Sequence, residues 1–175
     1  MSSFSNLYKL RKAVQTDSNL VWEILQEAIL KRKNEGSTQW QDGYPNEQVV
    51  VNDIANGEGY VVETHENILV AYIVVSERPE PAFEELKTGW LTFNTPYLVM
   101  HRLAITQNPK IKGLATWILQ QVEEIAKSKN ITSLKVDTNF DNLAMLHIFK
   151  KLDYVYCGEV FYRGSPRKAF EKLIK

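Results

Sequence analysis

Residues 97–126 constrain the fold more than any other stretch, because three patterns follow one another there in a fixed order. An apolar run over residues 97–105 predicts a strand. Apolar residues then recur with the 3.6-residue period of a helix, at positions 114, 117, 118, 122, 125 and 126. The turn between strand and helix contains Lys110, Lys112 and Gly113. Because the first amides of a helix are unpaired and its dipole favours negative charge, this turn predicts a phosphate site, with a solvated turn as the alternative.

Strand and helix patterns alternate along the rest of the chain, which predicts a mixed α/β fold. Further strands are expected at residues 7–13, 60–64, 69–75, 134–138, 154–162 and 169–174. Further helices are expected at residues 20–28, 49–54 and 141–152, the last with Asp141 as its N-terminal cap. Hairpin turns are expected at residues 65–67 and 164–166, and irregular connections at residues 34–46 and 78–96.

Composition narrows the class of protein. A chain of 175 residues with 44% hydrophobic residues has enough material for one domain, 1–175, but not for two full cores. Lys+Arg and Asp+Glu number 21 each, so nothing favours nucleic acid or an anionic membrane as a partner. No apolar run is long enough to span a bilayer, and the first residues lack the pattern of a signal peptide. These observations predict a soluble, cytoplasmic, single-domain protein.

The metal-ligating and redox-active residues are few. Cys157 is the sole cysteine, which excludes an internal disulfide. The three histidines, His65, His101 and His147, are scattered along the chain without metal-site spacing. We therefore expect no bound metal.

Two motifs and the order of the elements resemble the GNAT superfamily of N-acetyltransferases. Lys110-x-x-Gly113-x-Ala115 is similar to the family's pyrophosphate loop, Arg/Gln-x-x-Gly-x-Gly/Ala, with lysine in the first position. The segment Asn142-x-Ala144…Phe149-x-x-Leu152-Asp153-Tyr154 resembles the family's Asn-x-x-Ala-x-x-x-Tyr-x-x-x-Gly-Phe, with the alanine one place early. The resemblance covers essentially the whole chain. It implies a largely antiparallel sheet, flanked by helices and opened by a V-shaped split between the strands at 97–105 and 134–138.

The resemblance also implies acetyl-CoA, or coenzyme A, as the cofactor. Its pyrophosphate would be held by seven consecutive residues: Lys110, Ile111, Lys112, Gly113, Leu114, Ala115 and Thr116. The backbone of Leu103, Ala104 and Ile105 would contact the pantetheine and the thioester, with Ala104 beside the developing oxyanion. Asn142, which would also cap its helix, and Phe149 would complete the cofactor site.

The catalytic positions depart from the family's pattern. Val99 stands where an acidic general base is common, and valine cannot take a proton. His101 shares the strand face of Val99, so it is the candidate base, with a structural strand histidine as the alternative. Phe149 replaces the usual tyrosine acid, but a thiolate leaving group needs little help because alkyl thiols titrate near about 8.5. Cys157 is conceivable as a nucleophile, although a buried structural cysteine is the commoner situation.

The acceptor site is expected in the loop after the first helix. Trp40 and Tyr44 lie there in a Trp-x-x-Gly-Tyr-Pro segment that resembles a loop of some small-molecule acetyltransferases. The alternative is that both rings only staple the loop to the body of the protein. Asp137, at the end of its strand, is expected to bind the acceptor amine, or simply to end the strand.

The function implied by the resemblance is transfer of an acetyl group from acetyl-CoA to a primary amine by direct attack in a ternary complex, with a small molecule as the expected acceptor. Two alternatives stay open: a catalytically weak acyl-CoA-binding regulatory module, and an acetyltransferase of protein N-termini or lysines. A homodimer through the closing strands or the first helices is compatible with the sequence.

Overall fold

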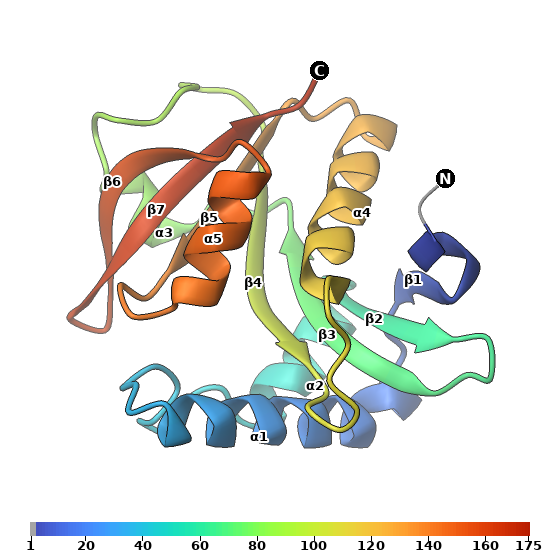
Figure 1. Ribbon diagram of the computed structural model, residues 1–175. Helices are drawn as coiled ribbons and strands as arrows, with labels where there is room; N and C mark the ends of the chain where they lie inside the picture. Colours follow the sequence, from blue (N-terminus) through green and yellow to red (C-terminus); the bar gives the residue numbers. More distant parts are fainter. Residues whose placement is uncertain (1–2) are drawn as a thin grey trace. The chain divides into compact units, whose positions relative to one another are not determined.

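The structure is a computed structural model that describes residues 3–175 (Figure 1). The chain divides into two compact units that interleave in sequence. The first unit comprises Met1–Val75 and Arg102–Ile118, and the second comprises Ser76–His101 and Leu119–Lys175. The fold is mixed α/β with a seven-stranded, mostly antiparallel sheet in the order β1-β2-β3-β4-β5-β7-β6. This architecture confirms the predicted fold class.

The first unit begins with a 3-10 turn at Ser3–Asn6, followed by β1 (Tyr8–Lys12) and a second 3-10 turn at Gln15–Asp17. Helices α1 (Ser18–Asn34) and α2 (Glu47–Ala55) follow, then the hairpin of β2 (Gly59–Thr64) and β3 (Leu69–Ser76). The hairpin register pairs Val61 with Tyr72, and β1 pairs antiparallel with β2.

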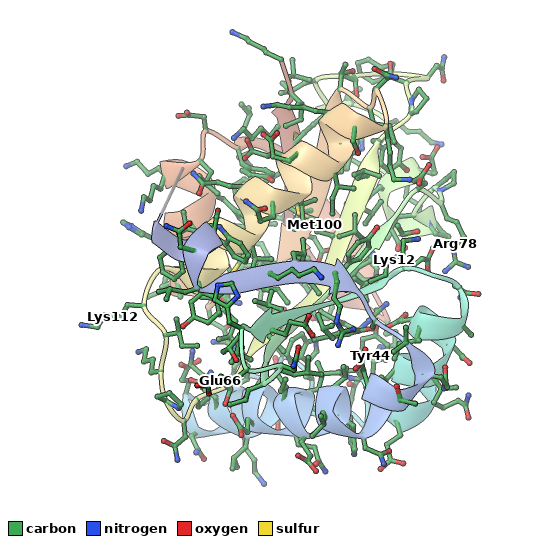
Figure 2. All side chains as sticks on the ribbon, turned by 90° about the vertical axis from the view of Figure 1, so that its right-hand side faces the viewer. Lys12, Tyr44, Glu66, Arg78, Met100 and Lys112 are labelled. Atoms are coloured by element: carbon green, nitrogen blue, oxygen red, sulfur yellow. The ribbon has the colours of Figure 1, made fainter. Side chains whose placement is uncertain are left out.

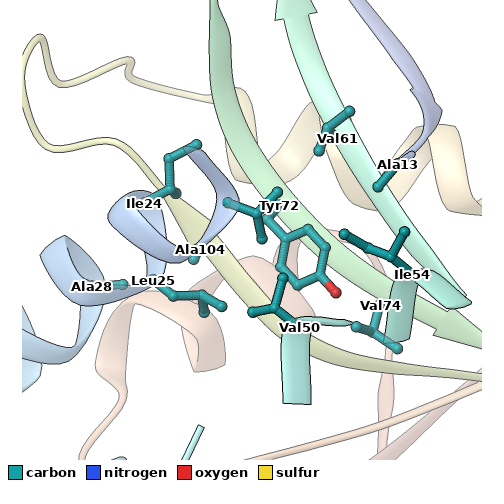
Figure 3. Close-up of a cluster of buried hydrophobic side chains, with 11 residues drawn as sticks. Ala13, Ile24, Leu25, Ala28, Val50, Ile54, Val61, Tyr72, Val74 and Ala104 are labelled. Atoms are coloured by element: carbon teal, nitrogen blue, oxygen red, sulfur yellow. The ribbon is translucent and has the colours of Figure 1, made fainter. Parts of the chain in front are cut away.

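Two helices cover one face of this hairpin, and Figure 3 shows the cluster that they form. The buried stripe of α1 includes Val21 and Leu25, spaced one turn apart. These side chains pack with Val50 of α2 and with Tyr72 of β3, which is fully buried. The stripe was readable in the sequence because its period matches a helix that buries one face.

The second unit holds α3 (Pro81–Glu84), β5 (Ser133–Thr138), α5 (Leu143–Lys151) and the closing pair β6 (Val155–Tyr162) and β7 (Ser165–Leu173). Strand β4 (Leu98–Ile105) and helix α4 (Leu114–Ser128) each run through both units. The parallel ladder of β4 with β5 joins Leu98–Met100 to Leu134–Val136 and ends there, although β4 continues to Ile105 and β5 to Thr138. A ladder that stops inside both strands agrees with the predicted split.

Three local predictions need correction. The connection at 78–96 is not wholly irregular, because Pro81 starts the short helix α3 with Glu80 as its cap. Of the two expected caps of α5, Asn142 is the one observed and Asp141 is not, since the Asn142 side chain accepts a hydrogen bond from the amide of Met145. The closing hairpin turns at Arg163-Gly164, so residues 165 and 166 already belong to β7.

Pro166 is tolerated inside β7 because of where it lies. The register pairs it with Phe161 of β6, whereas the ladder between β7 and β5 begins only at Lys168. The missing N–H of the proline therefore breaks no bond toward β5. No helix within residues 3–175 is both long and apolar enough to cross a membrane.

Candidate active site

The loop before α4 has the geometry of an anion site. Gly113 directly precedes the helix and has φ +84°, a conformation that favours glycine. Lys110, Lys112 and Gly113 are exposed, and Figure 2 shows the Lys112 side chain extending outward from the loop. The amides of Leu114, Ala115 and Thr116 have no partner within the helix, because they belong to its first turn. The residues present therefore fit a phosphate group of coenzyme A.

The N-terminal segment braces this loop within the first unit. A Cβ on Gly113 would lie 3.4 Å from the ring of Phe4, and that ring stacks on Trp117 with centroids 6.3 Å apart. The indole N–H of Trp117 also donates to the hydroxyl of Ser5, at 3.3 Å. These contacts fix the first turn of α4 against the segment that precedes β1.

The backbone that is expected to meet the thioester follows a bend in β4. Arg102 has φ +52°, which takes the strand out of the extended conformation immediately before Leu103. The side chain of Ala104 is buried in the core of the first unit, at 2% exposure. Leu103 and Ile105 are half-buried. The contribution of Ala104 to a ligand site is therefore confined to its backbone.

His101 lies between two carboxylates of the second unit. Its Nε2 is 3.0 Å from Oε2 of Glu80, and its Nδ1 is 3.8 Å from Oδ1 of Asp137. The ring also meets Phe83 and the edge of Tyr162, with centroids 6.4 Å and 6.2 Å away. The shorter contact is a hydrogen bond and the longer one is not. His101 is thus an oriented imidazole with an acidic group on each side.

Burial of Asp137 decides its charge properties. Burial raises the pKa of Asp137, and the opposing charges of His101 and Arg167 do not cancel that effect. A buried carboxylate with a raised pKa and a charged partner beside it is a candidate functional group. The predicted site residues His101 and Asp137 are therefore brought together by the fold.

Glu80 was missed in the sequence, and three contacts define its position. Its carboxylate accepts a weak hydrogen bond from the amide of Ala82, at 3.4 Å, besides the one from His101. Its own amide donates to the hydroxyl of Tyr97, which in turn donates to Glu84 at 2.9 Å. The Glu-Pro pair at 80–81 is typical of a helix start and was the available signal for α3, but nothing in the sequence linked it to His101.

Three other positions singled out in the sequence have clear structural surroundings. Val99 is buried among Phe83 and the rest of the apolar core of the second unit, which agrees with its inability to act as a base. Phe149 is fully buried between the rings of Tyr154 and Phe170, so its side chain offers no surface to a cofactor. Asn142, which was expected to contact the cofactor, uses its side-chain oxygen to cap α5.

Cys157 is buried, and its thiol donates to the carbonyl of Val155. Burial raises the pKa of Cys157 to about 11, so the thiol is protonated near neutrality. A protonated thiol is a poor nucleophile. The structure thus favours the structural interpretation of this cysteine.

The two rings of the candidate acceptor loop have different surroundings in the first unit. Trp40 is half-buried and packs on the core that contains α1 and α2. The hydroxyl of Tyr44, labelled in Figure 2, accepts a hydrogen bond from Nη1 of Arg102, whose guanidinium lies 5.8 Å from the centre of the tyrosine ring. Trp40 is therefore partly a staple, whereas Tyr44 is linked to β4.

A ladder that stops inside both of its strands, a bend in β4 and a glycine loop before α4 are the features expected of an acyl-CoA-dependent acetyltransferase. The chain belongs to the acetyltransferase (GNAT) family, which matches residues 20–154. Members of this family transfer acetyl groups from acetyl-CoA.

Solved structures agree with this assignment. A GNAT-family acetyltransferase from Streptococcus agalactiae 2603 is 32% identical, with a TM-score of 0.86 over 96% of each chain. A GNAT-family acetyltransferase from Listeria monocytogenes 4b F2365 is 16% identical, with a TM-score of 0.76 over 95% of this chain and 94% of that one. A Salmonella typhimurium protein solved with its cofactor acetyl-CoA shares the fold at 13% identity, with a TM-score of 0.68 over 96% and 94% of the two chains. No curated protein matches the chain.

Proposed function

We propose that this chain, 1–175, works as one N-acetyltransferase domain that moves an acetyl group from acetyl-CoA to a primary amine of a small molecule. The observation that carries the proposal is the arrangement around His101, which sits between Glu80 and Asp137. An imidazole that is held by one carboxylate and faces a second one suits the deprotonation of an ammonium group.

The donor is proposed to bind through the first unit. Lys110–Thr116 hold the pyrophosphate with backbone amides and two lysine side chains. The backbone of Leu103–Ile105 holds the pantetheine and the thioester carbonyl. An amide that meets the negative charge developing on that carbonyl oxygen contributes about 3 kcal/mol in other acyl transfers. Acetyl-CoA supplies an activated acyl group and a good leaving group, and the residues of the chain bind it, orient it and move the protons.

The proton chemistry is proposed to follow from the two contacts of His101. The Nε2–H group of His101 donates a hydrogen bond to Glu80, so the neutral ring presents the lone pair of Nδ1 on the side of Asp137. Asp137 binds the acceptor as an ammonium, and Nδ1 takes one of its protons. The freed nitrogen lone pair forms the new C–N bond as the C–S bond breaks. The sulfur leaves as a thiolate, and the remaining excess proton of the nitrogen passes to the thiolate or to water.

The test is release of coenzyme A thiol across a panel of small primary amines, with the parent and with His101→Ala. We expect turnover to fall at least about tenfold in the variant, and to fall most at pH values where the amine is protonated. Affinity for coenzyme A, measured by calorimetry, should be unchanged. His147→Ala is the matched control, because that histidine is exposed on α5. Binding of acetyl-CoA without thiol release from any amine would indicate a regulatory module instead. Release only with peptides would indicate a protein acceptor.

A further inference from the structure

Arg102 occupies an unusual conformation for its residue type. Among the described residues outside glycine, seven have positive φ, and Arg102 is the one that lies inside a strand. The left-handed conformation costs an ordinary residue about 1–2 kcal/mol, and it persists only where the surrounding structure enforces it. The contacts of the Arg102 side chain show what enforces it here.

A buried carboxylate of α2 holds the guanidinium with two parallel hydrogen bonds. Nε and Nη2 of Arg102 donate to the two oxygens of Asp53, at 2.9 Å and 2.7 Å. Asp53 accepts a third hydrogen bond from the hydroxyl of Tyr72, at 3.0 Å. Burial raises the pKa of Tyr72 far above its usual range, so this phenol remains a donor at every working pH. Bidentate geometry of this kind fixes the plane of the guanidinium.

The remaining terminal nitrogen reaches the loop between α1 and α2. Nη1 of Arg102 donates to the hydroxyl of Tyr44, and the guanidinium also lies near the face of that ring. Both side chains of the pair are largely buried, since Arg102 is 12% and Asp53 is 7% exposed. One guanidinium therefore ties the loop and α2 to a single residue of β4.

Arg102 lies in β4 between two residues that the proposed reaction uses. It directly follows His101, the proposed base, and directly precedes Leu103, the first residue of the backbone proposed to hold the thioester. We propose that Arg102 is a positioning residue: its ion pair with Asp53 holds the left-handed bend of β4, and its hydrogen bond to Tyr44 aligns the acceptor loop with that bend. This inference rests on the proposed acetyl transfer, and it assigns Arg102 no contact with substrate.

The experiment compares Arg102→Lys and Arg102→Gly with the parent. Lysine keeps the charge but cannot form the bidentate pair, and glycine removes the side chain while making the bend free of strain. We expect both variants to lower kcat, by about 100-fold for a misplacement on the order of 1 Å. Affinity for coenzyme A should change by less than threefold, because residues 110–116 are untouched. Tyr44→Phe should raise the KM of the acceptor while retaining most of kcat.

Arg11→Lys is the matched control for a lost ion-pair network. Arg11 also makes bidentate contacts, to Asp17 at 2.7 Å and 3.1 Å, and a further contact to Glu63 at 2.7 Å, but it lies on β1. The Arg11→Lys substitution should lower the melting temperature without changing kcat or KM. The inference is overturned if Arg102→Gly keeps the parent kcat, or if the Arg102 and Arg11 variants lose only stability. A parent protein that acetylates no amine would instead refute the proposed function, so the two failures are distinguishable.

Discussion

The contact between Glu80 and His101 makes the sharpest prediction for catalysis. Glu80 is 21% and His101 is 18% exposed, and Oε2 of Glu80 accepts a hydrogen bond from Nε2 of His101, with the two atoms 3.0 Å apart. A hydrogen bond to a charged group contributes about 2 kcal/mol, and a neutral one contributes about 1 kcal/mol. Glu80→Gln keeps a carbonyl acceptor for Nε2, so it should cost about 1 kcal/mol, or roughly fivefold in kcat. Glu80→Ala removes the acceptor altogether and should cost about 2 kcal/mol, or roughly 30-fold.

Both variants should lose turnover through the orientation of the His101 ring, so their affinity for coenzyme A should stay that of the parent. The assay is thiol release at saturating acetyl-CoA, measured over about four pH units around neutrality.

Glu84→Gln is the control for damage to α3. Glu84 lies in the same short helix and accepts a hydrogen bond from Tyr97, whereas the glutamate that contacts His101 is Glu80. Its kcat and pH profile should match those of the parent. If Glu80→Ala and Glu84→Gln lose activity equally, the effect comes from the helix and the proposed role of Glu80 is refuted.

Three further predictions concern the cofactor loop, the acceptor loop and the buried acid. Gly113→Asn and Gly113→Asp introduce side chains of the same size, and asparagine tolerates the φ of +84° better than most residues. Calorimetry should show that the aspartate variant binds coenzyme A at least about tenfold more weakly than the asparagine variant, and that difference isolates charge repulsion. Trp40→Ala should lower the free energy of unfolding by about 2 kcal/mol because the half-buried ring packs on the first core, and an acceptor KM equal to that of the parent would then leave Trp40 only a structural role. Asp137→Asn should raise the acceptor KM and stabilise the fold at pH 8. Burial raises the pKa of Asp137 in the folded state, so the folded state binds the proton more tightly than the unfolded state. The parent therefore loses stability as the pH rises above about 3.9. In denaturant titrations, the stability advantage of Asp137→Asn should vanish toward about pH 4.

The regular elements could be predicted because their signals are local. The stripe of α4 is an example: Leu114, Ile118 and Val122 are spaced by one turn, and all three are fully buried. Ile125 belongs to the same apolar pattern, but it is only half-buried in the last turn of the helix. The loop at Gly113 was equally readable, because a glycine before a helix of this length has a specific conformational use.

The partners of the candidate residues could not be predicted, because they come from distant parts of the chain. Glu80 is 21 residues from His101, and Asp53 is 49 residues from Arg102. Simple alternation along β4 correctly put His101 on the face of Val99, since both contact the cluster around Phe83. The bend at Arg102 left no trace in the sequence, since arginine is not a residue that marks positive φ.

Two connections that looked irregular in the sequence supply contacts to residues of β4. Glu80 comes from the connection at 78–96 and orients His101, whereas Tyr44 comes from the connection at 34–46 and meets Arg102. Both reach consecutive residues of one strand, immediately before the backbone proposed to hold the thioester. In the proposed function, the strand and the loop before α4 would serve the donor, and substitutions in the connection at 34–46 would change the acceptor. Loops carried by a rigid scaffold commonly divide the work in this way.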